Sequence, residues 1–89
     1  MPPQPLEEGV MVSMEFYLPR PKRLMRKKDP VEVMVHTSKP DVDNLAKAIL
    51  DCMTQAGWWR DDCQVFASVV RKWYHRKDGV PGATITVMA

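Results

Sequence analysis

Apolar residues along this chain follow two different periods, and each period predicts one kind of element. Over residues 10–18 they alternate with other residues, which is typical of a strand with one buried face. The inward set is Val10, Val12, Met14, Phe16 and Leu18, and two prolines just beyond it end the strand. Strand-like stretches follow at residues 31–36, 64–73 and 83–88. In the first of these we expect Val31, Val33 and Val35 to point inward.

The spacing changes to a helical one between the second and third strands. There the apolar residues recur at i, i+3, i+4, i+7, i+8 and i+11, which predicts one apolar face of an α-helix. That face consists of Leu45, Ala48, Ile49, Cys52, Met53 and Ala56. Gly57 follows directly and predicts the end of the helix. Because Cys52 belongs to this face, we expect it to be a buried free thiol.

The order of elements is therefore strand, loop, short strand, helix, strand, strand. The simplest packing of that order is an α/β (α+β) fold, with a small mixed or antiparallel sheet of about four strands covered by one main helix. A chain of 89 residues has room for one domain, residues 1–89, in which residues 1–9 form an irregular lead. A fold of this size is marginally stable alone, so oligomerisation is a natural source of further burial.

A cluster of polar residues marks the start of the predicted helix. Asp43, Asn44, Lys47 and Asp51 all fall away from the apolar face, and Asp41 precedes the helix in extended chain. Asp41 and Asp43 can then point the same way, and two hard oxygen ligands so close together suit Mg²⁺ or Mn²⁺. The alternative is that Asp43 is simply a helix N-cap, since acidic residues are favoured there in any protein.

Positive charge is concentrated in the loop over residues 19–30. Six of the thirteen cations lie within nine positions, although the net charge of the chain is only +2. A basic loop beside acidic residues fits a phosphate-rich substrate that is brought to a metal. A solvated charge run without a ligand is the alternative. The candidate phosphate-binding residues are Arg20, Lys22, Arg23, Arg26, Lys27 and Lys28.

Several classes of protein are disfavoured by the sequence. Cys52 and Cys63 do not make a disulfide framework, and no second Cys or His pair at ligand spacing accompanies them to form a zinc site. His36 could bind metal or phosphate, but a lone histidine at a strand end is more often a surface residue. No apolar run approaches the length of a membrane span, and the proline-rich start does not resemble a signal peptide. We therefore expect a cytoplasmic protein.

A second acidic pair, Asp61 and Asp62, follows the helix and two tryptophans. If the next strand returns alongside the one before the helix, Asp62 or Asp61 joins Asp41 and Asp43. Three carboxylates in one place repel unless a cation neutralises them, and a divalent ion there would orient water for attack at phosphorus. Lys47 could face the phosphate or instead form a structural ion pair. We expect Trp58 and Trp59 to fix the loop by packing, with base stacking as the alternative.

Two linked signatures give the chain a family resemblance. Residues 39–47, Lys-Pro-Asp-Val-Asp-Asn-Leu-Ala-Lys, are followed after the helix by Asp61-Asp62-Cys63-Gln64-Val65 and by a strand that carries Lys72. Over about residues 10–88 this resembles the RusA family of Holliday junction resolvases.

The resemblance implies a homodimeric, Mg²⁺-dependent endonuclease of DNA recombination and repair that makes paired nicks in four-way junctions. It is typical of phages and prophages, and so of a bacterial or phage-infected cell. It implies metal-binding acids at Asp41, Asp43 and Asp62, with Lys47 as the essential cation. Asn44, Asp51 and Asp61 are then supporting residues. The resemblance also makes the six cations of the basic loop DNA-binding residues, and Lys72 joins them.

The front of the chain departs from this family. Its members usually begin with a further strand and a helix before the strand that corresponds to residues 10–18. We expect this chain to lack both, so a truncated, non-catalytic DNA-binding or assembly module is the alternative function.

Overall fold

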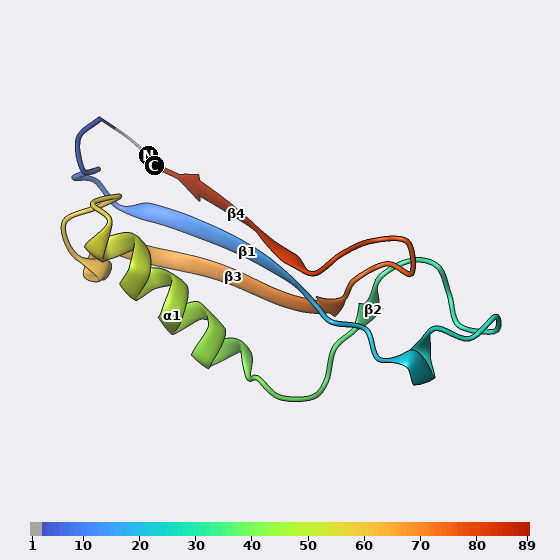
Figure 1. Cartoon of the computed structure of the whole chain (residues 1–89). Helices are drawn as coiled ribbons and strands as arrows, with labels where there is room; N and C mark the ends of the chain where they lie inside the picture. The colour runs from blue at the N-terminus through green and yellow to red at the C-terminus, as the bar shows by residue number, and fades with distance from the viewer. Residues whose placement is uncertain (1–2) are drawn as a thin grey trace.

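The structure is a computed structural model that describes residues 3–89. It consists of a four-stranded mixed sheet with one long helix packed on it (Figure 1). The spatial order of the strands is β2-β3-β1-β4, and β1 pairs with β3 in parallel and with β4 in antiparallel fashion. This confirms the predicted α+β fold. In chain order the elements are β1 (Val10–Leu18), η1 (Lys22–Leu24), β2 (Met34–Val35), α1 (Val42–Gln55), η2 (Asp62–Gln64), β3 (Val65–Tyr74) and β4 (Gly82–Met88).

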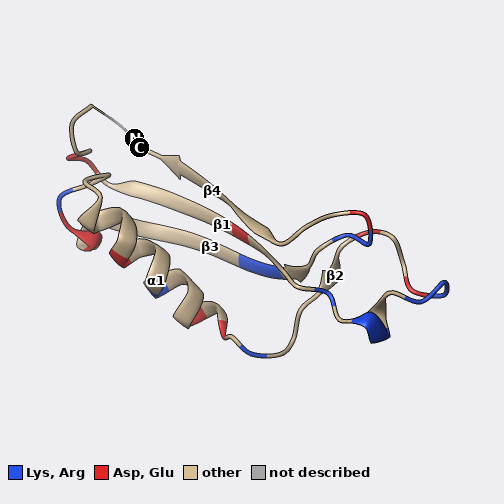
Figure 2. Cartoon of the chain, in the orientation of Figure 1, with Lys and Arg blue, Asp and Glu red and all other residues tan. Residues whose placement is uncertain are grey.

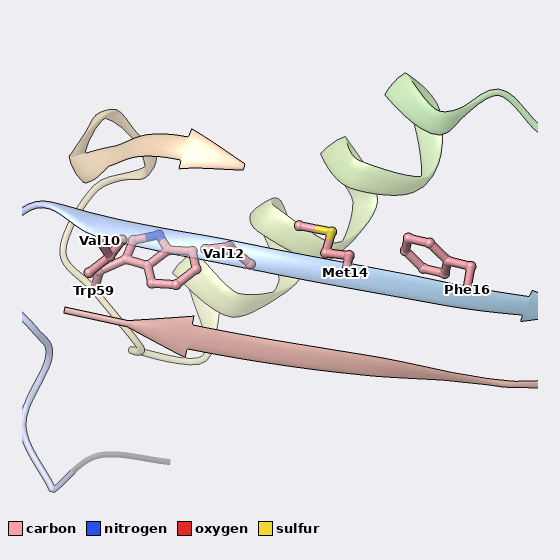
Figure 3. Close-up of a cluster of buried hydrophobic side chains, with 5 residues drawn as sticks. All are labelled: Val10, Val12, Met14, Phe16 and Trp59. Carbon is pink, nitrogen blue, oxygen red and sulfur yellow. The ribbon is translucent and has the colours of Figure 1, made fainter. Parts of the chain in front are cut away.

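β1 is the centre of the core, as its alternating pattern predicts. Val10, Val12 and Met14 are fully buried and Phe16 is nearly so, while the residues between them are only half-buried. Trp59 lies beside these side chains at one end of β1 (Figure 3). Because parallel strands need a long crossover, the chain passes from β1 through α1 before it returns as β3.

α1 packs on the sheet with a different face from the predicted one. Leu45, Ile49 and Met53 pack against the core as expected, but Leu50 does so as well, whereas Cys52 is exposed. Burial of a leucine stabilises the fold more than burial of alanine or cysteine at the other edge of the stripe, so the helix is turned towards Leu50. The prediction of a buried Cys52 thiol is therefore wrong. The helix ends at Gln55 with Ala56 as its C-cap, and Gly57 follows with a φ of 88° that stops the helix, as predicted.

The predicted strand over residues 31–36 is mostly irregular. Only Met34 and Val35 pair with β3, and Val31 and Val35 are exposed rather than inward. His36, expected at the surface, is instead 7% exposed and lies against Tyr74, with ring centroids 4.5 Å apart. The reason is that β2 meets only the last two residues of β3, so the segment crosses the end of the sheet. No helix within residues 3–89 is long and apolar enough to cross a bilayer.

Candidate functional site

The first acidic pair lies at the N-terminal end of α1. Asp41 is the residue before the helix and has the predicted extended backbone, with φ −73° and ψ 151°. Its side chain is 58% exposed, caps no helical N–H group and lies 3.7 Å from the Lys39 ammonium. Asp43 is in the first turn and is exposed. The N-cap is thus Asp41 rather than Asp43, and neither carboxylate is used up by capping.

Lys72 supports the loop that leads into this pair. Its Nζ donates hydrogen bonds to the carbonyl oxygens of Ser38 and, at 2.9 Å, of Pro40. The C-terminal part of β3 is thereby tied to the backbone next to Asp41. His36 lies beside the same cation, and its burial together with Lys72 lowers the pKa of the imidazole. Within residues 3–89 its Nδ1 has no hydrogen-bond partner.

The remaining candidate residues of α1 are exposed. Lys47 is one turn along the helix from Asp43, and in the described part of the chain it forms no ion pair with Asp43 or Asp51. Asn44 is likewise exposed in the first turn. The predicted polar face of the helix therefore exists, and its amine is available to a ligand.

The second acidic pair is held by a hydrogen-bonded turn after α1. Asp61 precedes η2, and its Oδ1 accepts a hydrogen bond from the Cys63 N–H at 2.9 Å. This bond lowers the pKa of Asp61, while the carboxylate in turn raises the pKa of the Cys63 thiol. Asp62 begins η2 and is exposed.

Gln64 is the centre of that turn, a role that the sequence reasoning missed. Its Oε1 accepts from the N–H groups of Arg60 and Asp61 at 2.9 and 3.0 Å, and its Nε2 donates to the carbonyls of Leu6 and Glu8 at 2.9 and 3.0 Å. All four hydrogen-bonding positions of the amide are satisfied. The spacing of Asp61 and Gln64 is that of a capping box, and this pattern could have identified the turn.

Trp59 anchors the same turn to the core. It is 1% exposed, and its Nε1 donates a 2.7 Å hydrogen bond to the Thr54 hydroxyl on α1. This confirms the predicted packing role. Next to it is a hollow of about 220 Å³, lined by Asp51, Thr54, Gln55, Arg60, Asp61 and Asp62.

The two acidic pairs do not meet within one chain. α1 has 14 residues, and at about 1.5 Å per residue it separates its two ends by roughly 21 Å. Because β3 is parallel to β1, its start lies at the far end of the crossover helix from Asp41 and Asp43 (Figure 2). In the described residues no three His, Cys, Asp or Glu side chains are grouped to hold a metal ion. The expected convergence of Asp62 with Asp41 and Asp43 in a single chain is therefore wrong.

The basic loop lies at the other end of the sheet from the Asp61–Asp62 turn (Figure 2). Arg20 differs from the other predicted DNA-binding residues because it is only 7% exposed. Its guanidinium donates to the carbonyls of Leu24, Pro30, Glu32 and His75 at 2.7, 2.6, 3.1 and 3.4 Å. The assignment of Arg20 to phosphate binding is therefore wrong, since a buried guanidinium that donates to four carbonyls holds the loop closed instead. Exposed cations remain at Lys22, Arg23, Arg26, Lys27 and Lys28.

Comparison with known proteins identifies the family. The family model described as endodeoxyribonuclease RusA matches residues 1–88. This chain belongs to the RusA family. Curated relatives named crossover junction endodeoxyribonuclease RusA from Escherichia coli K12, Shigella sonnei and Enterobacteria phage 82 are each 41% identical to it over 64 residues. The alignment covers 66% of this chain and 53% of each relative, so the chain spans about half the length of the curated relatives it matches.

The two signatures that suggested the RusA family thus occupy opposite ends of one helix. Residues 39–47 form the loop and first turns at its start, and residues 61–65 form the turn after its end. Each is fixed by its own set of contacts, through Lys72 at one end and Gln64 at the other. One chain therefore holds its two acidic segments apart, at opposite ends of α1.

Proposed function

We propose that this chain is a metal-dependent, structure-selective DNA endonuclease that cuts four-way junctions as a homodimer by paired symmetric nicks. The observation that carries the proposal is the family match over residues 1–88, because its relatives are named as crossover junction endodeoxyribonucleases. The exposed acids and Lys47 are in keeping with that chemistry. They form two half-sites, one at the start of α1 and one in the turn after its end. It would act in the cytoplasm of a bacterial or phage-infected cell.

The residues proposed to hold the metal are Asp41, Asp43 and Asp62. Asp41 and Asp43 are two residues apart at the start of α1, whereas Asp62 follows the far end of the helix. Carboxylates such as this pair bind Mg²⁺ together with waters and phosphate oxygens. We propose that Asp62 comes from the partner copy, since a two-fold arrangement can bring opposite ends of two helices together twice. When bound, Mg²⁺, or Mn²⁺ in its place, supplies an activated water and neutralises charge on the phosphate.

The other residues then have defined tasks. Lys47 lies one turn from Asp43 and would orient the scissile phosphate through its ammonium group. Lys72 keeps the Ser38–Pro40 backbone in place, so that Asp41 is presented at a fixed position. Asn44, Asp51 and Asp61 support the two half-sites. The cations of the basic loop contact DNA backbone phosphates at a distance from the reaction.

Mixed dimers of two inactive variants test this proposal. Asp43→Asn and Asp62→Asn are each expected to abolish Mg²⁺-dependent cleavage of a synthetic four-way junction. After the two variants are mixed and allowed to exchange subunits, a mixed dimer has one site with both lesions and one site with none. Nicking should then reappear, mostly in one strand per junction. Sites contained within single chains would leave every mixture inactive, and that result would refute the shared site.

A non-catalytic DNA-binding module is the second candidate function. The observation in its favour is that the described chain alone gathers no three metal ligands. This candidate predicts junction binding without product in the wild-type chain, whether or not Asp43 is changed. Cleavage that depends on added Mg²⁺ and on Asp43 would eliminate it.

A further inference from the structure

His36 follows β2 directly and is a buried histidine with an unused ring nitrogen. Its ring packs against that of Tyr74, with the ring planes at 50° to each other, and its backbone N–H donates to the Lys72 carbonyl at 3.3 Å. Its Nδ1 is shielded from water, and no atom of residues 3–89 forms a hydrogen bond with it. A buried polar atom without a partner is rare in a folded protein and requires an explanation.

Lys72 connects this histidine to the first acidic pair. Its Nζ donates to the carbonyl oxygens of Ser38 and Pro40, and Pro40 immediately precedes Asp41. The segment from His36 to Asp41 is therefore attached to β3 at its first residue and, near its end, through one ammonium group. β2 adds two paired residues before it. A short segment held by so few contacts opens locally at a low cost in free energy.

The position of His36 suits a neutral imidazole and disfavours a protonated one. In the neutral ring one nitrogen carries a proton and the other is an acceptor, so Nδ1 can remain unprotonated. Protonation places an N–H group and a positive charge at Nδ1, which has no hydrogen-bond partner in the described chain. The new charge would also lie beside the Lys72 ammonium group.

The charged groups around the ring add to this effect. Burial, and after it the charge of Lys72 on β3, lower the pKa of His36, while its own backbone acts less strongly in the opposite direction. Tyr74, the other β3 residue against the ring, contributes an aromatic face. Within residues 3–89, no carboxylate is among the groups that shift this pKa, so no acid stabilises the protonated ring.

We propose that His36 is a positioning residue for the acidic pair at the start of α1, and that uptake of a proton by its imidazole releases the segment that carries Asp41. The proposal rests on the proposed function, because release matters for catalysis only if Asp41 binds the metal. With a neutral ring, the segment stays on β3 and Lys72 holds the backbone next to Asp41. With a charged ring, the attached segment contains two neighbouring cations, one of them buried. The segment then leaves β3, and the imidazolium gains water.

The direction of the pH dependence follows from the two states of the segment. In the released segment the ring lies in water, and its pKa is close to the ordinary value of about 6.5. In the attached segment the pKa of His36 is lower. Release is therefore coupled to proton uptake, so it is constant above about pH 7 and increases as the pH falls below about 6.5. At about pH 5.5 the released ring is charged about ten times as often as it is neutral, which raises the equilibrium constant for release up to about tenfold.

Hydrogen exchange in the metal-free chain tests the release itself. The probe is the N–H group of residue 36, and its protection factor, which removes the intrinsic effect of pH, is measured by NMR at pH 7.5 and 5.5. We expect protection to fall about tenfold in the wild type. His36→Phe keeps an aromatic ring against Tyr74 but takes up no proton, so its protection should not depend on pH. His75→Phe removes the other histidine of the chain and, as the matched control, should behave like the wild type.

Two results of these measurements overturn the proposal. One is protection in the wild type that does not depend on pH, and the other is an equal loss of protection in His36→Phe. The ring of His36 in the wild-type chain gives a measurement that needs no substitution of this residue. Its NMR signal is assigned by comparison with His75→Phe, and a pKa at or above about 6.5 also overturns the proposal.

Mn²⁺ binding, followed by electron paramagnetic resonance, tests the connection to the acidic pair. Between pH 7.5 and 5.5 the dissociation constant should rise at least threefold more in the wild type than in His36→Phe, which retains every other titrating group. An equal rise in both overturns the positioning role, even if the segment is released as expected. Absence of Mn²⁺ binding at both pH values, with release as expected, would instead refute the proposed function and leave the proton-driven release intact.

Discussion

Replacement of Arg20 by methionine should strongly destabilise the end of the molecule that carries the basic loop, although Arg20 lies outside the main hydrophobic core. Arg20 is buried, and its guanidinium joins carbonyls from three stretches of chain: Leu24 in the basic loop, Pro30 and Glu32 before β2, and His75 after β3. Methionine fills much of the same volume but donates nothing. The carbonyls would lose their partner while they remain largely shielded from water.

The magnitude follows from the hydrogen bonds. Three of the four are 3.1 Å or shorter, and a bond from a charged donor contributes about 1.5–3 kcal/mol. Because bonds to one group are not additive, we expect a loss of about 3–5 kcal/mol. A domain of this size has a total stability of about 4–13 kcal/mol, so the loss is a large fraction of it. Arg71→Met, which breaks an exposed ion pair to Glu15, should cost about 0–1 kcal/mol.

Urea denaturation gives the free energy of unfolding of both variants, and hydrogen exchange shows where protection is lost. In Arg20→Met, exchange should rise most over residues 21–35. Binding to a four-way junction should weaken as well, although Lys22, Arg23, Lys27 and Lys28 are unchanged. If Arg20→Met and Arg71→Met differ by less than 1 kcal/mol and residues 21–35 stay protected, the hydrogen-bond reasoning is refuted.

Three further results are expected from the structure. Gln64→Met removes four hydrogen bonds from the turn that carries Asp62, so it should weaken Mn²⁺ binding at least tenfold. Gln64→Glu keeps the two bonds in which the side chain accepts, so it should retain part of the Mn²⁺ binding. Equal Mn²⁺ binding by both variants and the wild type would contradict this role of Gln64. Asp61→Asn should speed alkylation of Cys63 at pH 8, because loss of the carboxylate lowers the pKa of the thiol and raises the fraction of thiolate. Mass spectrometry of the alkylated peptide measures the rate, and a slower reaction than in the wild type would contradict the argument. Replacing Arg26 and both lysines that follow it with alanine should flatten the plot of log junction affinity against log salt concentration. The slope should fall by about 0.9 for each DNA phosphate that these side chains neutralise, and an unchanged slope would exclude the loop from the interface.

The strands and the helix follow from local sequence patterns, and the sequence therefore predicts them well. β1 alternates because one of its faces is buried from Val10 to Phe16, and Gly57 stops the chain from continuing α1 because it can adopt a positive φ. The side of α1 that faces the sheet was less predictable. Leu45, Ile49 and Met53 belong both to a helix face that includes Cys52 and to one that includes Leu50. Only the packing of the larger Leu50 side chain on the core selects the second face.

Burial of polar residues could not be predicted from local patterns. Arg20 is first in a run of cations, and nothing in that run distinguishes it from its exposed neighbours. Its burial depends on carbonyls as far away as His75, which only the closed loop brings within reach. His36 is a similar case, because the aromatic ring that covers it belongs to Tyr74 on β3.

The same limit explains why the convergence of the acids within one chain was wrongly predicted. The sequence identifies both acidic pairs, yet their spacing along the chain says little about their distance in space, because a rigid helix lies between them. A connection of 18 residues, 44–61, could fold back as a loop and bring its ends together. As a 14-residue helix beside a parallel strand it holds them about 21 Å apart. A helix that packs this way positions each acid firmly and at the same time prevents one chain from using both in a single site.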